Sequence, residues 1–324
     1  MSRLLAYAAV ALAAIPAIAQ SVVAPNAMSE TVSVGYVMIP FTVLGDHGKP
    51  ITDLRDAEFD LTVDGSTVRS DMFEKSQNAP VSFTILLDGS GSMALAGKID
   101  SARAAIGALI AHRRPGDDFA LYFFAESKAR EVVPFTENPA DITRALATLT
   151  PYGKTAFFDA LATMPERSRL GRNPTRAIIL LSDGIDNASS LTRGALAQQL
   201  QGIAIPIYSL GLREPVGTSN GGNHPREDLS DIGLLNEVAT LTGGKLCLGN
   251  TPQQIAEAVS YIEGDLRAQY LIGFAPTGKG GVKYRTISLK LNGRARAVRV
   301  RAGYLGTEPP LVAARNKHLE RKRR

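Results

Sequence analysis

The sequence has few residues of the kinds that build disulfide or zinc sites. Cys247 is the only cysteine, so no disulfide can form within the chain. The four histidines, His47, His112, His224 and His318, are scattered, and none has the spacing of zinc ligands. The sequence therefore does not support a disulfide framework, a zinc site or a Cys–His nucleophile.

Long apolar runs, internal repeats and heptad arrays are also absent. The apolar stretch Leu4–Ile15 is too short to span a membrane, so we predict no transmembrane segment. It follows Arg3 and leads to an A-x-A-type site that ends at Ala19. This order of charged, apolar and small residues is typical of a secretory signal peptide. We expect residues 1–19 to be cleaved and the protein to be exported to the periplasm, the cell surface or the medium.

The charge pattern gives little support for a nucleic-acid partner. The formal net charge is +5, and six of the 36 Lys and Arg residues lie between positions 315 and 324. Such a terminal basic run is typical of a solvated, mobile tail, which we expect for residues 306–324. Basic and aromatic residues do not interleave elsewhere, so we predict that nucleic acid is not bound.

Two β-rich regions flank the middle of the chain. Their short strands are separated by turn signals such as Asp64-Gly65. The predicted strands cover residues 32–44, 59–63, 66–73, 269–274, 284–291 and 295–300. Because a small sheet buries little apolar surface alone, we expect residues 28–78 and 268–305 to combine into one β-sandwich-like module.

Residues 80–266 alternate between β-rich and helical patterns. Val81–Leu87 is a mostly apolar, β-rich run, typical of a strand buried on both faces. Further strands are predicted at 119–124, 176–181, 205–210 and 245–248, with 130–135 as an antiparallel edge strand. Helices are predicted at 98–112, 141–149, 156–167, 192–201, 234–242 and 252–266. This alternation predicts the α/β class with a doubly wound, mostly parallel sheet. The polar segment 214–231 is predicted as a loop that is either functional or disordered.

Oxygen-bearing side chains follow two of the predicted core strands. Asp88, Ser90 and Ser92 alternate with glycines directly after the first strand, and Asp183 follows the strand at 176–181. Thr155 precedes a predicted helix. Because parallel strands end at one edge of a sheet, we expect these five side chains to converge there. Carboxylate and hydroxyl oxygens suit Mg²⁺, Mn²⁺ or Ca²⁺. Taken alone, the first motif is explained equally well as a polar turn.

The combination of DGSGS, GKT before a helix and LLSDG resembles the metal-ion-dependent adhesion site of von Willebrand factor type A domains. The flanking patterns, including QYLIGFAP and RVRAGY, resemble exported bacterial proteins of the von Willebrand factor-related acidobacterial type. The resemblance implies that Ser90, Ser92 and Thr155 offer hydroxyls to Mg²⁺, with Mn²⁺ or Ca²⁺ as alternatives. It implies that Asp88 and Asp183 act directly or through water, and that a partner protein supplies a further carboxylate.

Enzymatic functions have weaker support in the sequence. Gly153-Lys154-Thr155 resembles the end of a phosphate-binding loop, but Thr148 stands where that motif needs Gly. Ser90 is not in a G-x-S-x-G elbow, and no histidine lies near the three motifs in sequence. A metal-assisted hydrolase is the alternative function, although no general base is evident. A third possible function is that of a structural surface protein in which the metal only stabilises a loop. We expect a non-enzymatic, metal-dependent protein-binding module.

Overall fold

The computed structural model describes residues 36–46, 50–55, 59–75, 79–201, 203–213, 227–276, 283–291 and 297–306. The predicted signal peptide, residues 214–226 of the predicted loop and nearly all of the predicted basic tail lie outside these residues. Within the described ranges, no helix has the length and apolar character that a membrane crossing requires.

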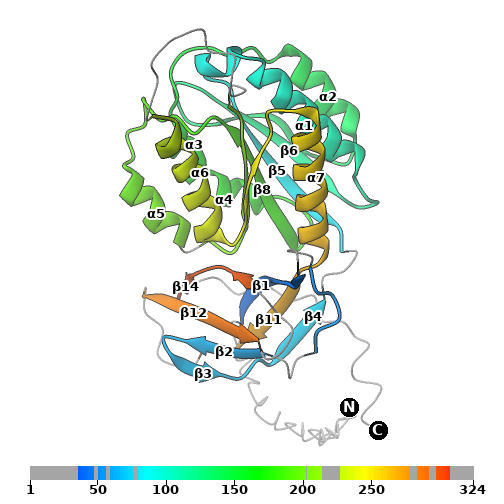
Figure 1. Ribbon diagram of the computed structural model, residues 1–324, viewed down its shortest axis with the longest axis vertical. Coiled ribbons are helices and arrows are strands. Elements are labelled where there is room, and N and C mark those ends of the chain that lie inside the picture. The colour runs from blue at the N-terminus through cyan, green and yellow to red at the C-terminus, as the bar shows by residue number, and fades with distance from the viewer. Residues whose placement is uncertain are drawn as a thin grey trace, which may run out of the picture. The chain divides into compact units, whose positions relative to one another are not determined.

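The central sheet has six strands, which Figure 1 shows between two layers of helices. The strands are β5 (Val81–Asp88), β6 (Asp118–Phe124), β7 (Arg130–Thr136), β8 (Thr175–Ser182), β9 (Ile207–Gly211) and β10 (Leu246–Leu248). Their order is β10-β9-β8-β5-β6-β7. All neighbours pair in parallel except β6 and β7, which are antiparallel. The predicted mostly parallel α/β sheet, with its antiparallel edge strand, is therefore confirmed.

Helices cover both faces of this sheet. They are α1 (Lys98–Ala111), α2 (Pro139–Thr148), α3 (Phe157–Ala162), α4 (Met164–Ser168), α5 (Arg193–Gln201), α6 (Glu227–Thr242) and α7 (Pro252–Arg267). The buried side chains of α1, α2 and α7 share one hydrophobic cluster, and those of α3 to α6 share another. The central position of β5 between two such layers explains why all eight of its residues are buried.

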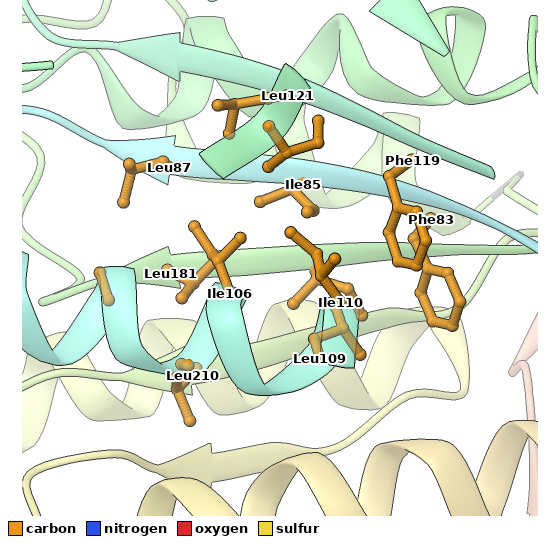
Figure 2. Close-up of a cluster of buried hydrophobic side chains, with 14 of the residues drawn as sticks. Phe83, Ile85, Leu87, Ile106, Leu109, Ile110, Phe119, Leu121, Leu181 and Leu210 are labelled. Carbon is orange, nitrogen blue, oxygen red and sulfur yellow. The ribbon is translucent and has the colours of Figure 1, made fainter. Parts of the chain in front are cut away.

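The two clusters follow the alternation of side chains along β5. Figure 2 shows Ile85 and Leu87 of β5 on the side of the sheet that faces Ile106 and Ile110 of α1. Leu86, which lies between them in sequence, belongs to the opposite cluster. Successive side chains of a strand point to opposite faces, so a strand buried on both faces favours apolar residues at successive positions. Val81–Leu87 is apolar except at Ser82 and Thr84, and the buried Ser82 hydroxyl donates a hydrogen bond to Oδ1 of Asp118.

The flanking segments form two antiparallel four-stranded sheets. Their strands are β1 (Val37–Leu44), β2 (Phe59–Val63), β3 (Ser66–Val68), β4 (Met72–Lys75), β11 (Tyr270–Phe274), β12 (Tyr284–Leu291), β13 (Ala297–Val300) and β14 (Gly303–Leu305). The orders are β13-β1-β11-β4 and β14-β12-β2-β3. Strands from the two ends of the sequence alternate in the first sheet and meet at the β12–β2 pair in the second. Side chains of both sheets share a third hydrophobic cluster, in which Phe41 stacks on Tyr270 at 5.4 Å. The predicted sandwich-like architecture is confirmed.

Three predicted elements differ from the structure. The helix predicted over 156–167 is two helices, because Pro165 has no N–H to continue α3 and its ring conflicts with the preceding turn. The strand predicted over 66–73 is split, since β3 pairs with β2 in one sheet and β4 pairs with β11 in the other. Helix α6 begins at Glu227, so the last residues of the predicted loop are helical.

Candidate metal centre

Asp88 ends β5 and is completely buried. Its Oδ1 accepts a hydrogen bond from the backbone N–H of Ser90 at 2.9 Å, and its Oδ2 accepts one from the Ser182 hydroxyl at 2.6 Å. The carboxylate therefore fixes the start of its own loop and the end of the neighbouring strand β8. A buried carboxylate needs such partners, because an unpaired charge in a protein interior is strongly unfavourable.

The glycines of this loop allow a second loop to lie against it. At Gly89, a Cβ atom would lie 1.8 Å from the ring of Phe123, so no larger residue fits without a shift. The carbonyl oxygen of Gly89 accepts the N–H of Tyr152 at 2.7 Å, and the N–H of Gly91 donates to the carbonyl oxygen of Gly153 at 3.0 Å. These two backbone hydrogen bonds bring the loop that carries Thr155 beside the loop that follows Asp88.

The two serine hydroxyls lie next to each other. The Oγ atoms of Ser90 and Ser92 are 3.1 Å apart, where the chain enters the 3₁₀ turn η3 (Gly91–Ala94). In an octahedral shell with bonds of about 2.1 Å, adjacent ligands are separated by about 3.0 Å. The spacing of the two hydroxyls is thus close to that of neighbouring ligands of one Mg²⁺ ion.

Thr155 is buried and is tied to the segment that follows Asp183. Its N–H donates to Oδ1 of Asn187 at 2.8 Å, and its carbonyl oxygen accepts the N–H groups of Asn187 and Ala188 at 3.0 Å each. The three segments that carry the predicted ligands are therefore joined by hydrogen bonds. The structure brings these segments together at the carboxyl ends of β5 and β8.

Asp183 has a partner that sequence reasoning missed. Its Oδ2 lies 2.8 Å from Nζ of Lys98, and both side chains are at most 10 % exposed. Its Oδ1 accepts the N–H of Ile185 at 3.4 Å. Lys98 opens α1, directly after Ala96 and Gly97, whose φ angles are 51° and 69°. The left-handed conformation costs Ala96 about 1–2 kcal/mol.

One signal in the sequence points to Lys98. A basic residue in the first turn of a helix interacts unfavourably with the helix dipole, by about 0.3–1 kcal/mol. A lysine at the first position of a predicted helix, directly after a cluster of acidic and hydroxyl residues, is therefore a candidate for an ion pair with that cluster. The ion pair with Asp183 compensates for the unfavourable position.

Nearby polar residues have structural tasks. Oδ1 of Asp186 accepts the N–H of Phe157 at 2.9 Å, and Oγ of Ser189 accepts the N–H of Phe158 at 2.9 Å. These contacts satisfy the first N–H groups of the short helix α3, which have no partners within the helix. They hold the start of that helix, and with it the neighbouring Thr155, in place.

The charges at this edge favour a cation. Burial, and next the charge of Asp183, raise the pKa of Asp88 to about 7, against the opposing effect of its hydrogen bonds from Ser182 and Ser90. Asp183 pairs with Lys98 and lies close enough to Asp88 to affect its pKa, so these three groups have a net negative charge when both carboxylates are ionised. Within the described ranges, no three His, Cys, Asp or Glu side chains gather as a metal cluster. Hydroxyls therefore have to complete the donor set, and an all-oxygen set of this kind fits Mg²⁺.

The fold is an α/β domain whose mostly parallel sheet carries oxygen-bearing side chains at the carboxyl ends of β5 and β8, the edge at which open α/β sheets commonly place ligand sites. Residues 83–185 match the family model of the von Willebrand factor type A domain. The chain therefore contains a von Willebrand factor type A domain, as its motifs predict.

Solved structures with a similar fold come from several bacteria. A von Willebrand factor type A protein from Catenulispora acidiphila has 15% identity and a TM-score of 0.48, with 84% of this chain and 72% of that chain covered. An aerotolerance-related membrane protein from Bacteroides fragilis has 20% identity and a TM-score of 0.41, with 57% and 98% covered. The von Willebrand factor domain of a type V pili tip protein from Porphyromonas gingivalis has 14% identity and a TM-score of 0.43, with 57% and 94% covered. None of the curated proteins compared with the chain matches it.

Proposed function

We propose that this protein is an exported binding module in which a divalent cation captures a carboxylate of a partner protein. The observation that carries the proposal is the meeting of three segments at one sheet edge, where the buried carboxylate of Asp88 lies beside Ser90 and close to the buried Asp183. The signal-peptide pattern of residues 1–19 supports export. We propose no catalytic step.

In this proposal the hydroxyls of Ser90, Ser92 and Thr155 hold the ion, while Asp88 and Asp183 act directly or through water. Mg²⁺ would supply a Lewis-acidic centre with a position open to an outside oxygen. Asp88 already accepts two hydrogen bonds from the protein, which fits a role in orienting the loop as well as in balancing the charge. The ion pair with Lys98 partly neutralises the charge of Asp183, which limits the negative charge that faces the ion.

The surface near the site offers contacts to a protein partner. Leu95 follows the turn η3, and Tyr152 lies in the loop that bonds to Gly89; their side chains are 58% and 50% exposed. Both are apolar groups on segments that carry or adjoin the predicted ligands. Aromatic and apolar side chains are enriched at the cores of protein interfaces. The partner that fits this surface presents an acidic side chain flanked by apolar residues.

The experiment that tests this function is a retention assay with the mature protein immobilised. We expect a partner to be retained in Mg²⁺, released by chelator and displaced by an excess of a free acidic peptide. The variant Asp88→Ala should retain nothing above background. Retention that is unchanged in excess chelator would contradict the proposal, as would retention by Asp88→Ala equal to that of wild type.

A further inference from the structure

The ammonium of Lys98 forms an ion pair with a carboxylate oxygen of the proposed metal centre. Its Nζ lies 2.8 Å from Oδ2 of Asp183, and the two side chains are 10% and 4% exposed. The other oxygens of the acidic pair also have partners, because both oxygens of Asp88 and Oδ1 of Asp183 accept hydrogen bonds. A cation that approaches Oδ2 of Asp183 therefore meets a positive charge already bound there.

This contact is built into the backbone. Lys98 is the first residue of α1, and the two preceding residues, Ala96 and Gly97, both have left-handed φ angles. The turn closes with a hydrogen bond from the N–H of Lys98 to the carbonyl oxygen of Leu95 at 3.1 Å. An exposed lysine samples many rotamers, whereas this side chain is largely buried and starts from a fixed position.

We infer that Lys98 is an internal competitor of the metal ion, which pairs with Asp183 when the ion is absent and weakens Mg²⁺ binding at this site. The inference rests on the proposed function, because it concerns the same metal centre. If an ion bound the same Asp183 oxygen directly, the two positive charges would lie within about 5 Å of each other. Lys98 must then leave Asp183 or remain close to the ion, and both alternatives reduce the affinity.

The same contact stabilises the loops themselves. Without Lys98, the carboxylates of Asp88 and Asp183 would face each other with no cation, which is unfavourable for buried groups. With Lys98 the loops stay in place before the ion arrives. Because of Lys98, the stability of the loops does not depend on a bound metal ion.

The test compares Mg²⁺ binding by isothermal titration calorimetry in the mature chain after removal of metal. Lys98→Met removes the charge and keeps the length of the side chain, Lys98→Gln is a polar second variant, and Lys98→Arg keeps the charge. Lys75→Met is the matched control, because Lys75 is an exposed residue of β4 in the sandwich module. We expect the Met and Gln variants to bind Mg²⁺ about tenfold more tightly or better. Lys98→Arg and Lys75→Met should stay within about twofold of wild type.

Thermal unfolding provides a second readout. In chelator, Lys98→Met should have a lower Tm than wild type, and Mg²⁺ should raise its Tm by more than it raises that of wild type. Equal or weaker Mg²⁺ affinity of both Lys98→Met and Lys98→Gln would overturn the competitor role while leaving the metal site in place. If neither wild type nor any variant bound Mg²⁺, the proposed function and this inference would both be wrong.

Discussion

Replacing Asp88 by Asn should strongly weaken metal binding and leave the fold intact. The amide of Asn has the shape of the carboxylate, and its oxygen can still accept the N–H of Ser90. Its NH₂ group can donate to the Ser182 hydroxyl, which now donates to Asp88 at 2.6 Å. The hydrogen-bond network is then kept, and one of two neighbouring buried negative charges is lost.

The size of the two effects follows from the burial of Asp88. At an effective dielectric constant of about 20, a divalent ion about 4 Å from a carboxylate gains about 8 kcal/mol. If dehydration leaves only a quarter of this, about 2 kcal/mol, the loss is still about thirtyfold in Mg²⁺ affinity. In chelator, the free energy of unfolding should change by no more than about 1 kcal/mol, because the hydrogen bonds persist.

Calorimetry with Mg²⁺ and urea unfolding in chelator measure the two quantities separately. Asp60→Asn is the matched control, since Asp60 is an exposed residue of β2 and the change in charge is the same. An Asp88→Asn variant that binds Mg²⁺ like wild type would refute a role for Asp88 at the metal. A variant that is unfolded in chelator would refute the proposed replacement of its hydrogen bonds.

Three further changes test other parts of the structure. Thr155→Val keeps the size of the side chain and the backbone hydrogen bonds, so it should weaken Mg²⁺ binding about tenfold, measured by calorimetry, at an unchanged Tm. Asp265→Ala leaves the buried charge of Arg299 without its ion-pair partner and should lower the free energy of unfolding in urea by about 3 kcal/mol. Gly89→Ala should destabilise by about 1–3 kcal/mol in the same assay, because its Cβ meets the ring of Phe123, and adding Phe123→Leu should restore part of the loss.

Each of these three changes has an outcome that contradicts it. For Thr155→Val, an unchanged Mg²⁺ affinity would exclude its hydroxyl from the ligands. For Asp265→Ala, a loss below about 1 kcal/mol is the size seen for exposed ion pairs, and it would mean that water replaces the carboxylate. For Gly89→Ala, no gain from the second substitution would show that the ring of Phe123 is not what limits the space.

The central sheet could be predicted because its signals are local and strong. Val81–Leu87 is apolar except at Ser82 and Thr84, which is typical of a strand buried on both faces, and the edge rule for parallel strands placed the segments of Asp88 and Asp183 together. This placement could be predicted without knowing any individual side-chain contact. The metal roles of the five residues stay a prediction.

Two of the features that were missed depend on tertiary contacts or on one backbone angle, and a third could have been read from the sequence. The ion pair of Lys98 requires the left-handed turn at Ala96, and alanine gives no local signal for that conformation. The sheet change between β3 and β4 depends on which partner strand is available, and β11 comes about two hundred residues later in the chain. The break at Pro165 was readable from the sequence, because proline is poorly tolerated inside a helix.

The pairing of β1 with β11 and β13 has a consequence for the order of folding. Strand β1 lies between two strands that are made after the entire α/β domain, so its sheet cannot close until that domain has been synthesised. At the base of the domain, Nη1 of Arg267 donates to the carbonyl oxygen of Ala79 at 2.7 Å, across 188 residues of sequence. Once the α/β domain is folded, the two flanking segments start close together in space although they are far apart in sequence. The entropic cost of pairing their strands is then lower. A folded α/β domain therefore brings the two flanking segments close enough to pair.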